Sequence, residues 1–70
     1  MTRLTMTIVA SNGVENEQIL FDAGSALHLF AKECAERGFV LVPDKHSRNG
    51  THMESSLVIP CHRVREISEN

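Results

Sequence analysis

The sequence predicts an α+β fold: a small β-β-α-β-β domain with one helix packed on an antiparallel sheet of two hairpins. Two Asn-Gly pairs are each typical of a hairpin turn, and the flanking apolar runs align when the chain folds back at each pair. The segment between them has apolar residues at helical spacing. The 70 residues suffice for one domain, which we place at residues 1–67, and we expect residues 68–70 to form a flexible tail.

The first hairpin is expected to turn at Asn12-Gly13, because both residue types tolerate a positive φ. Folding the chain back there sets Met6 opposite Ile19 and Thr7 opposite Gln18. The alternation then produces one buried face and one wet face, as in an antiparallel pair that covers a core on one side. The residues expected on the buried face are Leu4, Met6, Ile8, Ile19 and Phe21.

The segment DAGSALHLFAKECAERG, residues 22–38, predicts a helix. Its apolar side chains recur at i, i+3, i+4 and i+7 and so form one face: Leu27, Phe30, Ala31 and Cys34. Asp22 or Ser25 can cap the start of the helix, and Gly38 can supply a left-handed end.

The second hairpin is expected to turn at Asn49-Gly50. Counting outward sets Leu41 opposite Val58, so that the apolar runs at residues 40–42 and 57–59 come into register. Pro43 has no N–H to donate and indicates a sheet edge, a bulge or a bend. We expect the polar tip, residues 44–56, to project from the domain and residues 57–65 to form one strand.

Composition excludes several classes of protein. The net charge is −2 with histidine neutral, which argues against non-specific attraction to phosphate backbones or anionic lipid. Two cysteines in 70 residues are too few for a secreted disulfide framework, and no secretory signal or apolar run of membrane-spanning length is visible. We expect a cytoplasmic protein with reduced thiols and no membrane partner.

The stretch SSLVIPCHRVREI, residues 55–67, holds the most reactive residue types. In a strand, Cys61 and His62 point to opposite faces and cannot act as a thiolate–imidazole pair. The string IPCHRV resembles the active-site string of the O6-alkylguanine-DNA alkyltransferase family, and this resemblance implies that Cys61 accepts an alkyl group with help from His62. It covers six of 70 positions without a helix-turn-helix upstream, so it stays a remote alternative. Otherwise, we expect both cysteines to be buried and slow to react.

Metal binding is a further alternative, since three histidines and a cysteine fall within 17 residues: His46, His52, Cys61 and His62. The spacing H-x5-H-x8-C-H matches no common zinc pattern. The hairpin register also places His46 and His52 on opposite faces. We therefore expect exposed histidines, no metal and no cofactor.

No set of nucleophile, base and orienting group survives this geometry, which argues against an enzyme. The leading hypothesis is a small non-enzymatic binding or regulatory module that acts through protein–protein contact, of the size typical of phage or plasmid accessory proteins and inhibitors. Exposed sheet edges would be its means of contact, and a homodimer would use them equally well. The alternative is a nucleic-acid-binding module using cations of the second hairpin and its long strand: Lys45, Arg48, Arg63 and Arg65.

Overall fold

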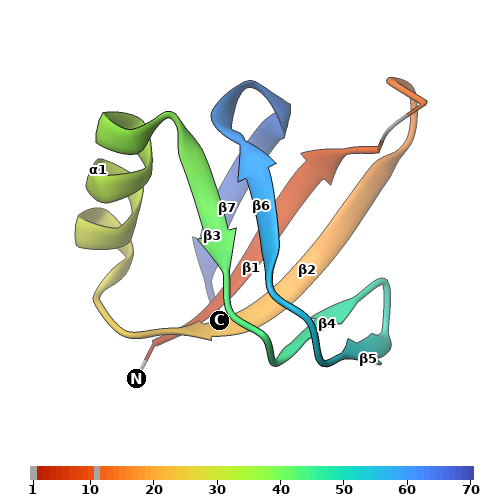
Figure 1. Ribbon diagram of the computed structural model, residues 1–70. Helices are drawn as coiled ribbons and strands as arrows, with labels where there is room; N and C mark the ends of the chain where they lie inside the picture. Colours follow the sequence, from red (N-terminus) through yellow and green to blue (C-terminus); the bar gives the residue numbers. More distant parts are fainter. Residues whose placement is uncertain (1, 11) are drawn as a thin grey trace.

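The computed structural model describes residues 2–10 and 12–70, and within them one helix lies on a mostly antiparallel sheet (Figure 1). This confirms the predicted α+β class. The elements are β1 (Thr2–Val9), β2 (Asn16–Ala23), α1 (Leu27–Arg37), β3 (Phe39–Val42), β4 (His46–Arg48), β5 (Thr51–Met53), β6 (Leu57–Pro60), a 3-10 turn (Cys61–Arg63) and β7 (Val64–Glu69). A five-stranded sheet has the order β5-β4-β2-β1-β7, and β3 and β6 form a separate pair.

The first hairpin has the predicted register, with Met6 opposite Ile19 and Thr7 opposite Gln18. Its turn is wider than the two residues expected. Gly13 has a positive φ of 77°, as expected for this turn. The side-chain oxygen of Asn12 accepts hydrogen bonds from the main-chain N–H groups of Val14 and Glu15. The register survives because the widened turn remains centred on the Asn-Gly pair.

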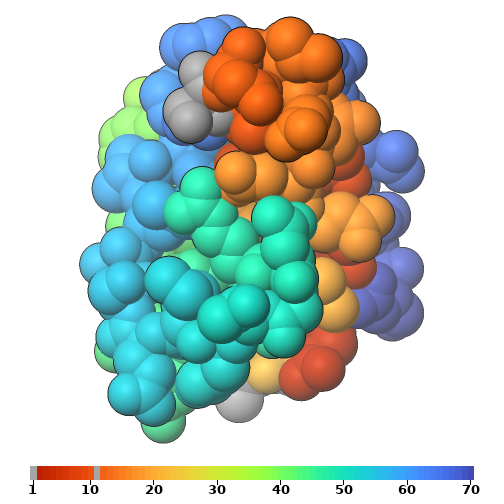
Figure 2. All heavy atoms as spheres, turned by 90° about the vertical axis from the view of Figure 1, so that its right-hand side faces the viewer, coloured from red at the N-terminus to blue at the C-terminus, as the bar shows by residue number. Residues whose placement is uncertain are grey.

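The second hairpin also has the predicted register, but it is divided between the two sheets. Asn49 and Gly50 both have positive φ, as a tight turn requires. The β3–β6 pair carries the base of the hairpin and the β4–β5 pair its tip, with a bend at residues 43–45. The tip does not project as expected, because β4 pairs with β2 and sets His46 opposite Phe21. Figure 2 shows the atoms of β4 and β5 filling the side of the molecule between β6 and the first hairpin.

Residues 57–65 are not one strand, contrary to expectation. Strand β6 ends at Pro60, the 3-10 turn follows, and β7 runs back along the free edge of β1 with Ile67 opposite Met6. The residues expected to form a flexible tail also take part in this pairing. Ser68 pairs with Thr5 in the sheet, and the main-chain N–H of Asn70 donates to the carbonyl oxygen of residue 3. The open edge of β1 supplies the hydrogen-bonding groups that order this segment.

The core lies between the five-stranded sheet and a layer made of α1 and the β3–β6 pair (Figure 1). All five residues predicted for the buried face of the first hairpin belong to it, and so does Ala23 of β2. The second layer contributes Cys34, Val40, Val42 and Ile59. The Phe30 ring of α1 packs against Phe21, with ring centroids 5.4 Å apart. This contact and the buried Cys34 fix the inner face of the helix.

The ends of α1 follow the prediction only in part. Gly38 ends the helix in the left-handed region, with a φ of 84°, and its N–H donates to the carbonyl oxygen of Cys34 at 2.8 Å. At the start, Ala26 occupies the cap position without a side-chain hydrogen bond, so neither Asp22 nor Ser25 caps the helix. Asp22 instead accepts a hydrogen bond from Arg3 on the sheet. In the described part of the chain, no helix has the length and apolar character needed to cross a membrane.

Candidate functional site

The outer face of the β3–β6 pair carries a block of exposed apolar side chains. Leu41 lies opposite Val58, and Phe39 lies opposite Pro60, so alternate residues of two paired strands place four side chains on one surface. Phe39, Leu41 and Val58 are 37%, 48% and 57% exposed, and Pro60 is half-buried. We call Phe39, Leu41, Val58 and Pro60 the apolar block.

The inner face of the same strand pair explains why the block is held in place. Val40, Val42 and Ile59 point the other way and are almost fully buried in the core. The pair is thus apolar on both faces, although only one is covered within the described residues. Contiguous exposed apolar surface is typical of a site of interaction with another molecule. The block therefore has the physical character of a binding surface.

The sequence contains a signal for this block that our sequence interpretation did not use. The segments FVLV and LVIP are apolar at every position rather than at alternate positions. Such runs are typical of strands covered on both faces. Among the described residues, only one of the two faces of this strand pair is covered.

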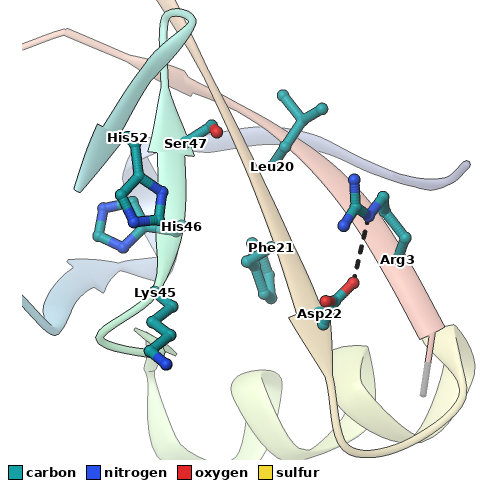
Figure 3. A pocket seen from close by; sticks show the side chains of 8 residues that line it. All are labelled: Arg3, Leu20, Phe21, Asp22, Lys45, His46, Ser47 and His52. Carbon is teal, nitrogen blue, oxygen red and sulfur yellow. Dashed lines mark hydrogen bonds and ion pairs between the residues drawn. The ribbon is translucent and has the colours of Figure 1, made fainter. Parts of the chain in front are cut away.

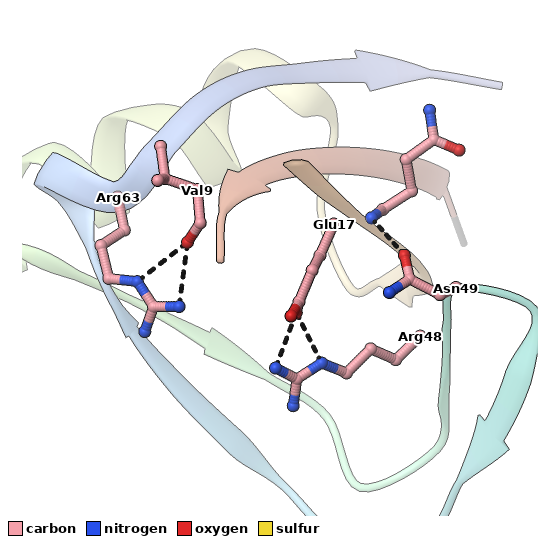
Figure 4. A network of polar contacts seen from close by, with 6 residues as sticks. Val9, Glu17, Arg48, Asn49 and Arg63 are labelled. Atoms are coloured by element: carbon pink, nitrogen blue, oxygen red, sulfur yellow. Dashed lines mark hydrogen bonds and ion pairs between the residues drawn. The ribbon is translucent and has the colours of Figure 1, made fainter. Parts of the chain in front are cut away.

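Two of the four predicted nucleic-acid-binding cations make contacts within the domain (Figure 4). Arg48 holds Glu17, with its Nη2 and Nε atoms 2.6 Å and 2.8 Å from the Oε2 atom. Arg63, on the 3-10 turn, donates from Nε and Nη2 to the main-chain oxygen of Val9 at 3.1 Å and 2.9 Å. Both guanidinium groups therefore use their Nε and Nη2 atoms for contacts within the domain.

The other two predicted cations, Lys45 and Arg65, are exposed, but they lie toward opposite edges of the five-stranded sheet. Lys45 directly precedes β4, whereas Arg65 lies on the edge strand β7. Strands β2 and β1 lie between β4 and β7 in the sheet order. The structure thus does not bring the four predicted cations together into one basic surface.

A polar hollow lies where β1, β2, β4 and β5 come together, and Figure 3 shows its lining. Its volume is about 210 Å³, below the ~300 Å³ at which small-molecule pockets begin. Three titratable side chains of the lining come from β4, β5 and the residue before β4: Lys45, His46 and His52. Arg3 also lines the hollow and forms an ion pair with Asp22, with its Nε 3.2 Å from Oδ1. The hollow has the size of a surface depression between polar side chains.

The histidines do not all lie exposed, as had been expected. His46 is buried, and its Nδ1 lies 2.9 Å from the main-chain oxygen of Pro43. His52 is exposed, with its Nε2 3.6 Å from the Glu54 carboxylate. Among the described residues, no three histidine, cysteine or acidic side chains come close enough to hold a metal ion.

Cys61 and His62 lie in the 3-10 turn rather than in the strand that we predicted. The Cys61 thiol donates to the main-chain oxygen of Cys34 at 3.2 Å, and His62 is exposed. The expectation that both cysteines are buried is wrong for Cys61, which is only half-buried. Cys34 is buried, and this burial raises the pKa of its thiol, with Cys61 nearby as the second cause.

Comparisons with protein family models, with curated proteins and with solved structures found no match for this chain. The candidate site is therefore defined by exposure and geometry. On these grounds the apolar block stands out, because it combines exposed apolar area with strands whose opposite face is locked in the core.

Proposed function

We propose that the protein is a small non-enzymatic binding module that contacts another protein through the apolar block. The observation that supports this is the exposure of Leu41 and Val58 on strands whose inner side chains are buried. Covering the block would remove apolar surface from water, which favours association. The partner surface would present apolar side chains of its own, because the block itself contains no charged or titratable residue.

The role that best suits a small domain with this apolar block is regulation of a partner protein by covering part of the partner's surface. A module of 70 residues can block or complete a partner's surface without chemistry of its own. We place it in the cytoplasm, since both cysteines are free and a reducing compartment keeps them so.

The test is a double variant of the block, Leu41→Ser with Val58→Ser. The matched control is Val14→Ser, because Val14 is 80% exposed and lies in the loop after β1, away from β3 and β6. A partner would be identified by affinity capture from the source cell, then purified for calorimetric titration. We expect the double variant to weaken binding at least about tenfold, equivalent to about 1.4 kcal/mol, while the control changes little.

Salt separates this proposal from its alternative. Apolar contact should persist at high salt, whereas binding to phosphate backbones falls steeply with salt concentration. The variant for nucleic acid is Lys45→Ala with Arg65→Ala, which removes the two exposed predicted cations. If this variant and added salt abolish binding while the Leu41/Val58 variant has no effect, the proposed function is wrong and the nucleic-acid reading replaces it.

Light scattering on the purified protein tests whether the partner is a second copy. A dimer that the Leu41/Val58 double variant converts to a monomer would make the apolar block a self-association surface, which supports the proposal. Urea unfolding of each variant confirms that the fold is retained, because changes at exposed positions stay within about 0.5 kcal/mol.

A further inference from the structure

A groove between α1 and β7 places the two cysteines side by side. Its walls are apolar and come from α1, β3 and β7, including Ala31, Val40 and Ile67. Cys34 from α1 and Cys61 from the 3-10 turn both line it. The volume of the groove is about 230 Å³, and it is open to solvent on one side. A small reagent can therefore reach the pair from outside.

Hydrogen bonds hold the two cysteines in this relation. The Cys61 Sγ lies 3.2 Å from the main-chain oxygen of Cys34, which also accepts the N–H of Gly38 at 2.8 Å. The main-chain N–H of Cys61 in turn donates to the carbonyl of Gly38 at 3.1 Å. A carbonyl oxygen lies about 2.4 Å from its own Cα. The Cys61 sulfur is therefore at most about 5.6 Å from the Cys34 Cα, which makes the two cysteines direct neighbours in the groove.

We propose that Cys34 and Cys61 form a reactive dithiol site, which hydrogen peroxide or a small organic disulfide converts into an intramolecular disulfide. The proposal concerns a groove distinct from the apolar block and does not depend on the proposed function. The modification is stoichiometric, because each chain reacts once until a cellular thiol reduces it.

Exposure assigns the order of reaction. Cys61 is the more exposed thiol and reacts first: its thiolate attacks one peroxide oxygen, the O–O bond breaks, and the departing hydroxide takes up a proton to become water. The Cys34 sulfur then attacks the sulfur of the Cys61 sulfenic acid, and the proton of the Cys34 thiol leaves with the displaced hydroxyl group as a second water. In sum, two thiols lose two hydrogens, one S–S bond forms, and one peroxide is reduced to two waters.

A small disulfide would reach the same product by exchange. Cys61 attacks one of its sulfurs and releases the first small thiol, after which Cys34 displaces the second. Burial raises the pKa of the Cys34 thiol, which keeps Cys34 protonated while Cys61 reacts. The resulting bond links the C-terminal end of α1 to the 3-10 turn across 26 intervening residues.

The experiment is equilibration of the native protein in buffers of reduced and oxidised glutathione. We expect a monomer lighter by two hydrogens, with peptide mapping that joins Cys34 to Cys61. The effective concentration of the pair should exceed that of the chain in concentrated guanidinium chloride by about tenfold or more, because the fold holds the thiols together. A mixed disulfide that remains at equilibrium in place of the intramolecular bond, intermolecular dimers, or equal effective concentrations in both states would overturn the proposal.

Single variants establish the order of reaction. In Cys34→Ala, peroxide should leave a sulfenic acid on Cys61 that dimedone traps, since no second thiol can resolve it. In Cys61→Ser, Cys34 should remain reduced under the same treatment. Trapping of Cys34 in that variant, with circular dichroism showing the native fold, would contradict the assignment of Cys61 as the attacking thiol.

Discussion

The guanidinium group of Arg63 donates two hydrogen bonds to the main-chain oxygen of Val9 (Figure 4). Arg63 belongs to the 3-10 turn that links β6 to β7, and Val9 is the last residue of β1. This contact ties the connection between the two layers to the end of a central strand. A residue that the sequence suggested for nucleic acid therefore has a structural role.

Replacing Arg63 tests this role. Arg63→Ala should lower the free energy of unfolding by about 1.5–3 kcal/mol, because the Val9 oxygen loses a charged donor in a half-buried place. The control is Arg65→Ala, an exposed arginine two residues along, with a change within about 0.5 kcal/mol. Urea denaturation measures the free energy of unfolding of both variants. Equal losses would show that the contact with Val9 does not stabilise the fold.

The ion pair between Glu17 and Arg48 should be stronger than that between Arg3 and Asp22. The side chains of Glu17 and Arg48 are 18% and 35% exposed, whereas those of Arg3 and Asp22 are 62% and 45% exposed. Double-mutant cycles with alanine should give a coupling of about 1 kcal/mol for Glu17 and Arg48 and below about 0.5 kcal/mol for the exposed pair. Thermodynamic unfolding data supply both cycles. A stronger coupling in the exposed pair would refute this ranking.

Gly38 should resist replacement because of its backbone conformation alone. Its φ of 84° is strained for any residue with a Cβ, although the space around it is open. Gly38→Ala should therefore cost about 1–2 kcal/mol. Gly24 has equally open space without a positive φ, so Gly24→Ala should be neutral or slightly stabilising. Thermal unfolding of the two variants compares these effects, and similar melting temperatures would contradict the expectation.

The buried Cys34 thiol should make stability depend on alkaline pH. Burial, and next the nearby Cys61, raises the pKa of Cys34 above its ordinary value of 9.0. The folded chain thus keeps a proton that the unfolded chain has lost, so the free energy of unfolding falls as pH rises above about 9. Cys34→Ala should show a shallower fall over the same range. Urea denaturation under reducing conditions, from about pH 7 to pH 11, gives both slopes, and parallel slopes would exclude a contribution from Cys34.

Local signals in the sequence were sufficient for the register of both hairpins. The Asn-Gly pairs fix which residues face each other, and so Met6 meets Ile19 and Leu41 meets Val58 as predicted. The stop of α1 at Gly38 likewise depends on one residue type. These features follow from short-range geometry, which a single sequence carries.

The features that sequence reasoning missed depend on pairings between distant segments. Strand β4 pairs with β2 and β7 pairs with β1, although the partners are far apart along the chain. No turn connects these partners directly, so the sequence contains no local signal for either pairing. The burial of His46 and the ordering of residues 68–70 both follow from those pairings. The exposure of the apolar block could have been inferred, because FVLV and LVIP supply apolar side chains for two faces in a chain with one small core.

Because the chain bends after Pro43, the second hairpin contributes strands to both layers and links them covalently (Figure 1). Its base forms the outer pair of strands and its tip extends the large sheet, so the same covalent segment crosses from one to the other twice. Neither layer can open without straining the other. Amide protons of Ile19 and Val40, one in each layer, should accordingly exchange with solvent through a single opening of the whole domain.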